Sequence, residues 1–116
     1  MARIVNQTRA TVLAERAGIA DTWWGRARGL LGRRTLPAGE GLIIRPCNSV
    51  HCLFMAFPID VIYVSDDNQV LRVAPDLKPF RVGPIVLGAR AVIELPSGTA
   101  AATGTRVGDT LVVTPA

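Results

Sequence analysis

The chain has 116 residues, 49% of them apolar, and a formal net charge of +4. A chain of this length fits one domain over residues 1–116, and its apolar content argues against intrinsic disorder. No apolar run reaches the ~20 residues of a membrane-spanning helix. The N-terminal sequence also lacks the apolar segment of a secretory signal. We therefore expect a cytoplasmic protein with no membrane partner, either a monomer or a small homo-oligomer.

Positive charge is concentrated in the first third of the chain. Residues 1–34 hold seven arginines and two acidic residues, whereas the rest of the chain holds six basic and seven acidic residues. This excess is either an ordinary solvated surface or an anion-facing patch for nucleic acid or phosphate, and the patch would use Arg26, Arg28, Arg33 and Arg34. Lysine is almost absent and few aromatic residues lie between the arginines, which makes nucleic acid the weaker of these interpretations.

Short apolar segments separated by Gly, Pro, Asn and Asp predict a mainly β protein. Strands are expected at residues 2–8, 11–18, 41–46, 59–65, 69–75, 84–88, 90–96 and 107–114. This spacing of strands and turns is typical of an antiparallel β-sandwich or barrel-like fold.

Two short helices accompany these strands, so the fold is α+β by a broader definition. Residues 22–33 place apolar side chains on one face of a helix that Asp21 or Thr22 can cap. Residues 97–104 predict one or two helical turns, which Ser97 or Thr99 caps and Gly104 ends.

Several short motifs, taken together and in this order, resemble the domain of unknown function 192 family, which is widespread in prokaryotes. The motifs are Arg26-x-x-Gly29-Leu30-Leu31-Gly32-Arg33, Gly41-Leu42-Ile43, His51 with Phe57-Pro58-Ile59-Asp60-Val61-Ile62-Tyr63-Val64, Ile93-Glu94-Leu95-Pro96-Ser97-Gly98-Thr99 and Gly104-x-x-x-Gly108-Asp109. The resemblance covers nearly the whole chain and implies a compact β-sandwich-like domain with no assigned activity. Two positions depart from the family pattern: Ala56 replaces a basic residue, and Cys52 replaces a small residue such as Thr.

Cys47, His51 and Cys52 stand close together in the sequence, but they do not form a recognisable metal motif. His51 and Cys52 are adjacent, so on a regular strand they point to opposite faces, and the chain has no second Cys or His pair. We expect no metal and no cofactor. A disulfide is also not expected, because a cytoplasmic chain keeps its thiols reduced. Both cysteines are interpreted as small buried residues.

Asp60 is the most informative polar residue because apolar residues surround it. A buried carboxylate must be hydrogen-bonded or paired, or its pKa rises. Asp60 therefore either caps backbone N–H groups where the chain bends after Pro58 or pairs with an arginine such as Arg26, or it accepts a ligand or a proton in a cleft. Glu94, which precedes Leu95-Pro96, poses the same alternatives. Gly108-Asp109 is interpreted as a tight turn before the last strand.

These observations favour a non-catalytic binding module for a small molecule or a peptide. The predicted ligand site is a groove that contains the following side chains: Arg26, His51, Met55, Phe57 and Asp60. A first alternative is an enzyme that uses His51 and Asp60 as an acid–base pair, with Cys47 as a nucleophile. A second alternative is the arginine-faced adaptor for nucleic acid or phosphate.

Overall fold

The computed structural model describes residues 1–20, 35–47, 57–79 and 83–115. In this part of the chain seven strands form one sheet with the order β5-β4-β6-β3-β2-β1-β7. The elements are β1 (Ala2–Asn6), β2 (Thr11–Ala20), β3 (Glu40–Ile44), β4 (Ile59–Val64), β5 (Val70–Leu77), β6 (Ala91–Pro96), α2 (Thr99–Thr103) and β7 (Leu111–Pro115). The mainly β, barrel-like fold expected from the sequence is confirmed.

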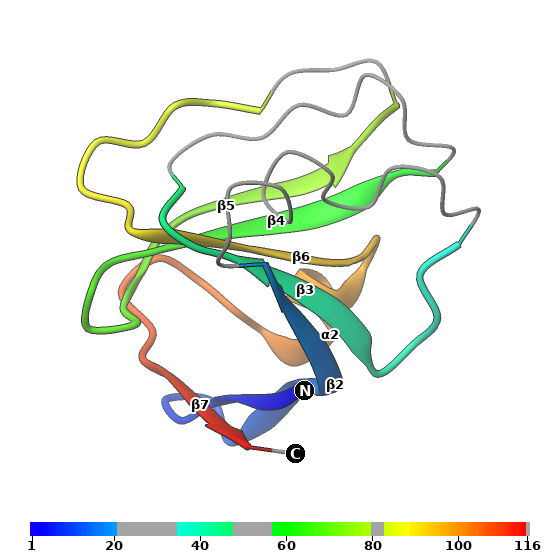
Figure 1. Ribbon diagram of the computed structural model, residues 1–116, viewed down its shortest axis with the longest axis horizontal. Helices are drawn as coiled ribbons and strands as arrows, with labels where there is room; N and C mark the ends of the chain where they lie inside the picture. The colour runs from blue at the N-terminus through cyan, green and yellow to red at the C-terminus, as the bar shows by residue number, and fades with distance from the viewer. Residues whose placement is uncertain (21–34, 48–56, 80–82, 116) are drawn as a thin grey trace.

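The sheet curls until its two edge strands approach each other at one end. Residues before β5 and β7 pair there, with an isolated bridge between Gln69 and Thr110. The Val70 N–H donates to the Asp109 carbonyl over 2.8 Å, and the Leu111 N–H donates to the Asn68 carbonyl over 2.9 Å. The result is a half-barrel with α2 in the curl of the sheet (Figure 1).

One strand pair departs from the expected antiparallel arrangement. β2 and β3 run parallel, with Arg16 opposite Glu40 and Ala20 opposite Ile44. All other neighbouring strands of the sheet are antiparallel. A parallel pair needs a connection of a dozen or more residues, and residues 21–39 are long enough to provide it. Short hairpin turns therefore account for only part of this topology.

The apolar residues form a core on each face of the sheet. The first core cluster lies inside the curl and contains Ala2, Ile4, Leu13, Ala14, Ala17, Ile43, Ile62, Val64, Val70, Ala91, Ile93, Leu95, Ala100 and Leu111. The second core cluster lies on the opposite face of the central strands and contains Ala20, Leu36, Ile44, Ile59, Val61, Tyr63, Ala89 and Val92. All six residues of β4 are buried because this strand contributes to both clusters.

The expected strand at residues 84–88 is wrong. This segment is a loop in which the side chains of Ile85 and Leu87 are 69% and 87% exposed. Gly88 has a φ of 89°, and the Ala89 N–H donates to the Val86 carbonyl, which closes a turn. The glycine and this turn interrupt an apolar run that otherwise has the composition of a strand.

The expected helix at residues 97–104 is confirmed as α2, but its N-terminal cap differs. Gly98 occupies the N-cap position, and the helix ends at Gly104 as expected. Neither Ser97 nor Thr99 occupies the cap position, and their hydroxyl groups donate to the Asp76 carboxylate and the Pro96 carbonyl. The helix expected at residues 22–33 lies outside the described residues. No helix among those that are described is long and apolar enough to cross a membrane.

Candidate ligand-binding groove

The carboxylate of Asp60 connects three segments that are distant in the sequence. Its Oδ1 accepts a hydrogen bond from the Asp76 N–H over 2.8 Å. Its Oδ2 accepts from the N–H groups of Gly98 and Ala100 over 3.1 and 2.8 Å. Asp60 is only 1% exposed. Asp60 therefore caps the first turn of α2 from a neighbouring strand, and its negative charge also complements the dipole at that helix end.

The bond to Asp76 is possible because β5 bulges opposite Asp60. The register places Ile59 opposite Leu77 but Val61 opposite Ala74, so β5 contributes two residues where β4 contributes one. Asp76 has a φ of 51°, a conformation that costs energy for a residue other than glycine. The hydrogen bond that Asp60 accepts from the Asp76 N–H stabilises this conformation.

A second contact ties the bulge to the segment that precedes α2. The Ser97 hydroxyl donates to Asp76 Oδ1 over 2.7 Å, and the Lys78 ammonium group donates to Asp76 Oδ2 over 2.6 Å. The hydrogen bonds from Lys78 and then Ser97 lower the pKa of Asp76 below its ordinary value. Asp76 is consequently a weak base, poorly suited to activate the Ser97 hydroxyl as a nucleophile.

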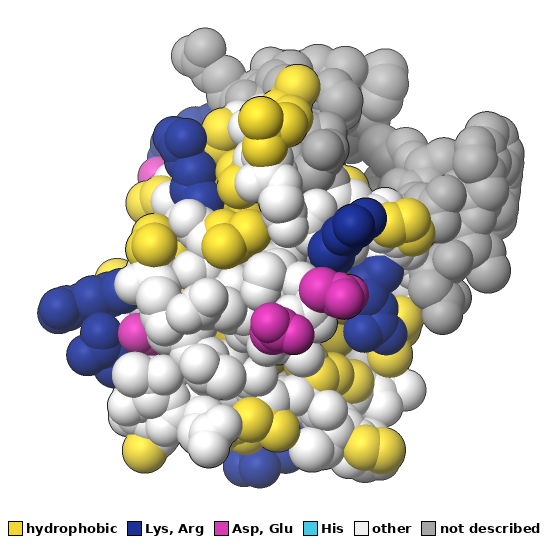
Figure 2. Space-filling view, turned by 90° about the vertical axis from the view of Figure 1, so that its left-hand side faces the viewer, with side chains coloured by type: hydrophobic (Ala, Val, Ile, Leu, Met, Phe, Trp, Pro, Cys, Tyr) yellow, Lys and Arg dark blue, Asp and Glu magenta, His cyan; other side chains and the backbone are white. Residues whose placement is uncertain are grey.

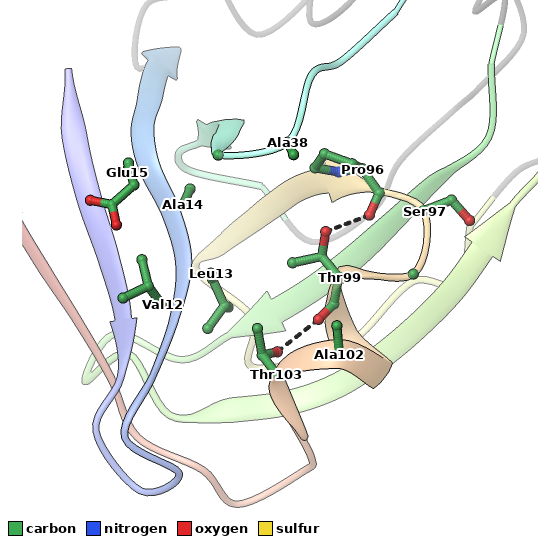
Figure 3. Close-up of a pocket in the computed structure, with 12 residues that line it drawn as sticks. Val12, Leu13, Ala14, Glu15, Ala38, Pro96, Ser97, Thr99, Ala102 and Thr103 are labelled. Carbon is green, nitrogen blue, oxygen red and sulfur yellow. Dashed lines mark hydrogen bonds between the residues drawn. The ribbon is translucent and has the colours of Figure 1, made fainter.

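These contacts position one wall of an open groove of about 480 Å³. The opposite wall is the first half of β2, and Ala38 and Gly39 lie at one end. The lining residues are Val12, Leu13, Ala14, Glu15, Ala38, Gly39, Pro96, Ser97, Gly98, Thr99, Ala102 and Thr103. In Figure 3, Leu13 lies on the α2 side of β2, whereas Val12 and Glu15 lie on the side that faces away from α2. The groove is therefore lined mainly by small side chains and backbone.

The hydroxyl groups in the groove are held by the backbone around them. Thr99 Oγ1 donates to the Pro96 carbonyl over 2.7 Å, and Thr103 Oγ1 donates to the Thr99 carbonyl over 2.8 Å (Figure 3). A hydroxyl that donates in this way can still accept a hydrogen bond through its oxygen. The groove thus offers an apolar surface with a few fixed polar atoms, as small-molecule and peptide sites do.

Glu94 lies on the opposite face of the sheet, in the second core cluster. It stands between Leu42 on β3 and Val61 on β4 and is 3% exposed. No residue in the described ranges donates a hydrogen bond to its carboxyl group. Burial raises the pKa of Glu94 to about 7, because a charge is costly among apolar neighbours.

Asp109 has more partners than a tight turn requires. Gly108 has a φ of 94°, as a turn before β7 demands, and this part of the sequence prediction is confirmed. Asp109 Oδ2 also accepts hydrogen bonds from Asn6 Nδ2, Arg9 Nε and the Arg106 N–H over 2.9, 3.1 and 2.9 Å. Burial alone would raise the pKa of Asp109, but these bonds, those from Arg9 and Asn6 first, outweigh it and lower the pKa to about 2. Asp109 anchors the last turn to β1.

Of the five residues predicted to share a ligand site, the structure describes Phe57 and Asp60. Phe57 is half-buried and packs against the second core cluster, whereas Asp60 opposes Leu95 on the face of the first cluster. The structure therefore does not bring these two side chains together. Arg26, His51 and Met55 lie outside the described residues. Their role in a ligand site stays a prediction.

Of the two cysteines, the structure describes Cys47. Cys47 is half-buried against the second core cluster, and its N–H donates to the Arg90 carbonyl over 3.1 Å. Among residues 1–20, 35–47, 57–79 and 83–115, no three His, Cys, Asp or Glu side chains converge as metal ligands would. His51 and Cys52 lie outside these ranges.

The arginines of the first third of the chain are likewise placed only in part. Arg3 pairs with Glu15 over 3.0 Å and Arg9 with Asp109 over 3.1 Å. Basic and acidic side chains lie beside one another on the face shown in Figure 2 rather than in separate areas. The four arginines proposed for an anion-binding patch lie outside the described ranges: Arg26, Arg28, Arg33 and Arg34.

The sequence of this chain matches a known protein family. The family model of DUF192, described as "Uncharacterized ACR", matches residues 4–113. The chain belongs to the DUF192 family. The resemblance seen in the sequence motifs is thereby confirmed. The segment Pro96–Thr99, which lies in the matched range, forms one wall of the groove, and Asp60 holds that wall in place through the N–H groups of Gly98 and Ala100.

Two curated relatives, both named UPF0127 proteins, match nearly the whole of this chain. A UPF0127 protein of Thermococcus sibiricus is 32% identical over 113 residues, which cover 91% of this chain and 71% of that protein. A UPF0127 protein of Pyrococcus abyssi is 30% identical over 114 residues, which cover 94% of this chain and 95% of that protein.

Two solved structures share the fold. A protein of unknown function from Novosphingobium aromaticivorans superposes with a TM-score of 0.82 at 26% identity, covering 96% of this chain and 82% of that one. A putative transcription regulator from Sinorhizobium meliloti gives a TM-score of 0.77 at 18% identity, covering 97% and 91%. At this low identity, the second likeness shows the fold alone.

Proposed function

We propose that this DUF192 protein is a non-catalytic binding module for a small molecule or a short peptide, and that the ligand occupies the groove beside α2. The observation that carries the proposal is a groove of about 480 Å³, which lies in the size range of ligand pockets. Its wall of backbone and small side chains is fixed by the hydrogen bonds to Asp60. A fixed wall loses little conformational entropy when a ligand binds.

The chemistry of the lining supports binding rather than catalysis. The hydroxyl groups of Ser97, Thr99 and Thr103 donate to a carboxylate or to carbonyl groups. A nucleophile needs a base within hydrogen-bond reach, and the base nearest to Ser97 is Asp76, whose pKa is lowered. The lining residues thus provide contacts and orientation for a ligand but no activated group.

A fragment screen followed by two-dimensional amide NMR tests this proposal. A library of small neutral fragments is titrated into the wild-type protein, and we expect chemical-shift changes to cluster at Leu13, Ala14, Ala38 and Ala102. The variant Ala102→Phe, which fills the groove from α2, is expected to abolish these changes. Ala101→Phe is the matched control, because Ala101 is also exposed on α2 but does not line the groove.

The result can also contradict the proposal. Fragments that bind equally well to Ala102→Phe do not occupy the groove. Shift changes that cluster around Phe57 and His51 instead would move the site to the place predicted from the sequence. Circular dichroism of both variants verifies that neither substitution has unfolded the chain.

A further inference from the structure

The groove has the position of a missing strand in the sheet. β2 extends from Thr11 to Ala20, but its pairing with β3 begins only at Arg16, opposite Glu40. On that side, Thr11–Glu15 has no strand neighbour among the described residues. The segment Pro96–Thr103 lies across the groove from this half of β2 (Figure 3). Thr11–Glu15 pairs with β1 on one side, and on the other side it is, among the described residues, an internal sheet edge that is open where β3 would continue.

Hydrogen bonds define both ends of this opening. At one end the N–H groups of Glu15 and Arg16 both donate to the Gly39 carbonyl, each over 2.9 Å. At the other end Thr11 Oγ1 donates to the Thr103 carbonyl over 2.9 Å. Strand residues rise about 3.3 Å each, so the interval from Thr11 to Glu15 is roughly 13 Å long. This length suits a short extended segment and is too short for a full-length strand.

The interval of roughly 13 Å would hold about four strand residues, and the volume of the groove sets a slightly smaller limit. In a packed sheet one strand residue occupies about 3.3 Å along the strand, about 4.8 Å between strands and about 10 Å across the sheet, which is roughly 160 Å³. The groove of about 480 Å³ therefore holds about three residues. Ala38 and Ala102 at its margin leave room for the side chains of such an occupant.

The charges of the lining define the chemistry of the occupant. Among the described residues, Glu15 is the only charged one that lines the groove. Its side chain lies on the far side of β2 from α2, and its carboxylate pairs with Arg3. The Arg16 guanidinium lies beside Gly39 at one end of the groove, but a charge carried against Leu13 and Ala14 would lose water without gaining an ion pair. A neutral segment matches the groove, with an apolar side chain against Leu13.

We propose that the groove binds a neutral, extended peptide segment of about three residues, which adds to β2 as a short strand in line with β3. This inference rests on the proposed function and narrows the ligand to a peptide that is recognised through its backbone. Backbone hydrogen bonds to β2 give affinity, and the small lining residues limit the size of the side chains.

The probe is the capped tripeptide acetyl-Val-Thr-Val-amide, together with analogues that are N-methylated at one residue at a time. In a strand, successive N–H groups point to opposite sides, so methylation should weaken binding in alternation. We expect a loss of about tenfold where the N–H faces β2, as for one lost hydrogen bond, and a loss of less than about threefold at the next position. Amide NMR titration measures each dissociation constant, and we expect the chemical-shift changes to appear at Leu13 and Ala14.

The protein variants provide the second arm of the experiment. Ala102→Phe should abolish binding of the tripeptide, and Ala101→Phe should leave its dissociation constant within about twofold. Equal losses at all methylated positions, or none, overturn strand addition while leaving the groove as a ligand site. Fragments that bind in the groove when the tripeptide does not would overturn the peptide inference alone. Tripeptide binding that survives Ala102→Phe overturns both proposals.

Discussion

Asp60 and Glu94 are buried carboxyl groups on adjacent central strands, yet their surroundings are opposite. Asp60 accepts three backbone hydrogen bonds on the face of the first core cluster. Glu94 lies among apolar residues on the other face, and within the described ranges no donor reaches it. The difference shows that sequence context alone does not define the role of a carboxylate. A residue surrounded by apolar neighbours in sequence can be a structural anchor or a titrating group, depending on which backbone N–H groups the fold brings to it.

The largest predicted effect on stability comes from removing the Asp60 carboxylate. Asp60→Ala should lower the free energy of unfolding by about 3 kcal/mol, because it removes three charge-assisted hydrogen bonds and uncovers the first turn of α2. Urea denaturation followed by circular dichroism measures the change. Asp60→Asn should fall between Ala and wild type, since its amide oxygen can still accept. A loss below about 1 kcal/mol for Asp60→Ala would show that the cap is not needed.

The second prediction concerns pH and Glu94. Its folded-state pKa is raised from 4.5 to about 7, so between these values the folded protein binds more protons than the unfolded chain. The stabilising contribution of Glu94 is present below pH 4.5 and is lost as the pH rises through about 7. Relative to Glu94→Gln, the wild type should lose about 3 kcal/mol of stability across this window. Urea denaturation of both proteins at several pH values tests this, and parallel pH profiles would contradict it.

The smallest predicted effect belongs to Asp109, which like Asp60 accepts three hydrogen bonds, although two of them come from side chains. Asp109→Asn should cost about 2 kcal/mol above pH 4, because it weakens the bonds from Arg9, Asn6 and the Arg106 backbone. The folded-state pKa is lowered from 3.8 to about 2, so this contribution is lost as the pH falls between those values. Acid titration of both proteins by circular dichroism should show that the difference in stability between wild type and Asp109→Asn becomes smaller below pH 3.8. A difference that stays constant with pH would assign the loss to packing rather than charge.

The strands were predictable where one local signal dominates. Apolar segments bounded by turn residues gave the positions of β1, β4 and β6, and glycine gave the end of α2 at Gly104. The loop around Ile85 is predicted as a strand because the sequence does not distinguish exposed apolar residues from buried ones. The parallel pairing of β2 and β3 could not be read from alternation, which reports the face of a side chain but not the direction of the neighbouring strand.

The candidate site was harder to predict than the fold. The capping role was one of the alternatives for Asp60, but its donors come from Asp76, Gly98 and Ala100, which no spacing rule connects to it. The groove was missed because three separate segments build it and most of its side chains are small. The segment Pro96–Thr99 is the one sequence signal at this place, and it indicates the family and a helix start rather than a groove.

The pairing of β7 with β1 has a consequence for how the chain is made. Ala2 lies opposite Pro115, so contacts that complete the sheet join strands that are far apart in the sequence. Contacts of such large sequence separation slow folding. On the ribosome, β1 and β2 can form a hairpin early, but the outer edge of β1 stays unpaired until β7 (Leu111–Pro115) has been translated. During that interval a chaperone or a neighbouring nascent chain has access to an edge that the finished protein conceals.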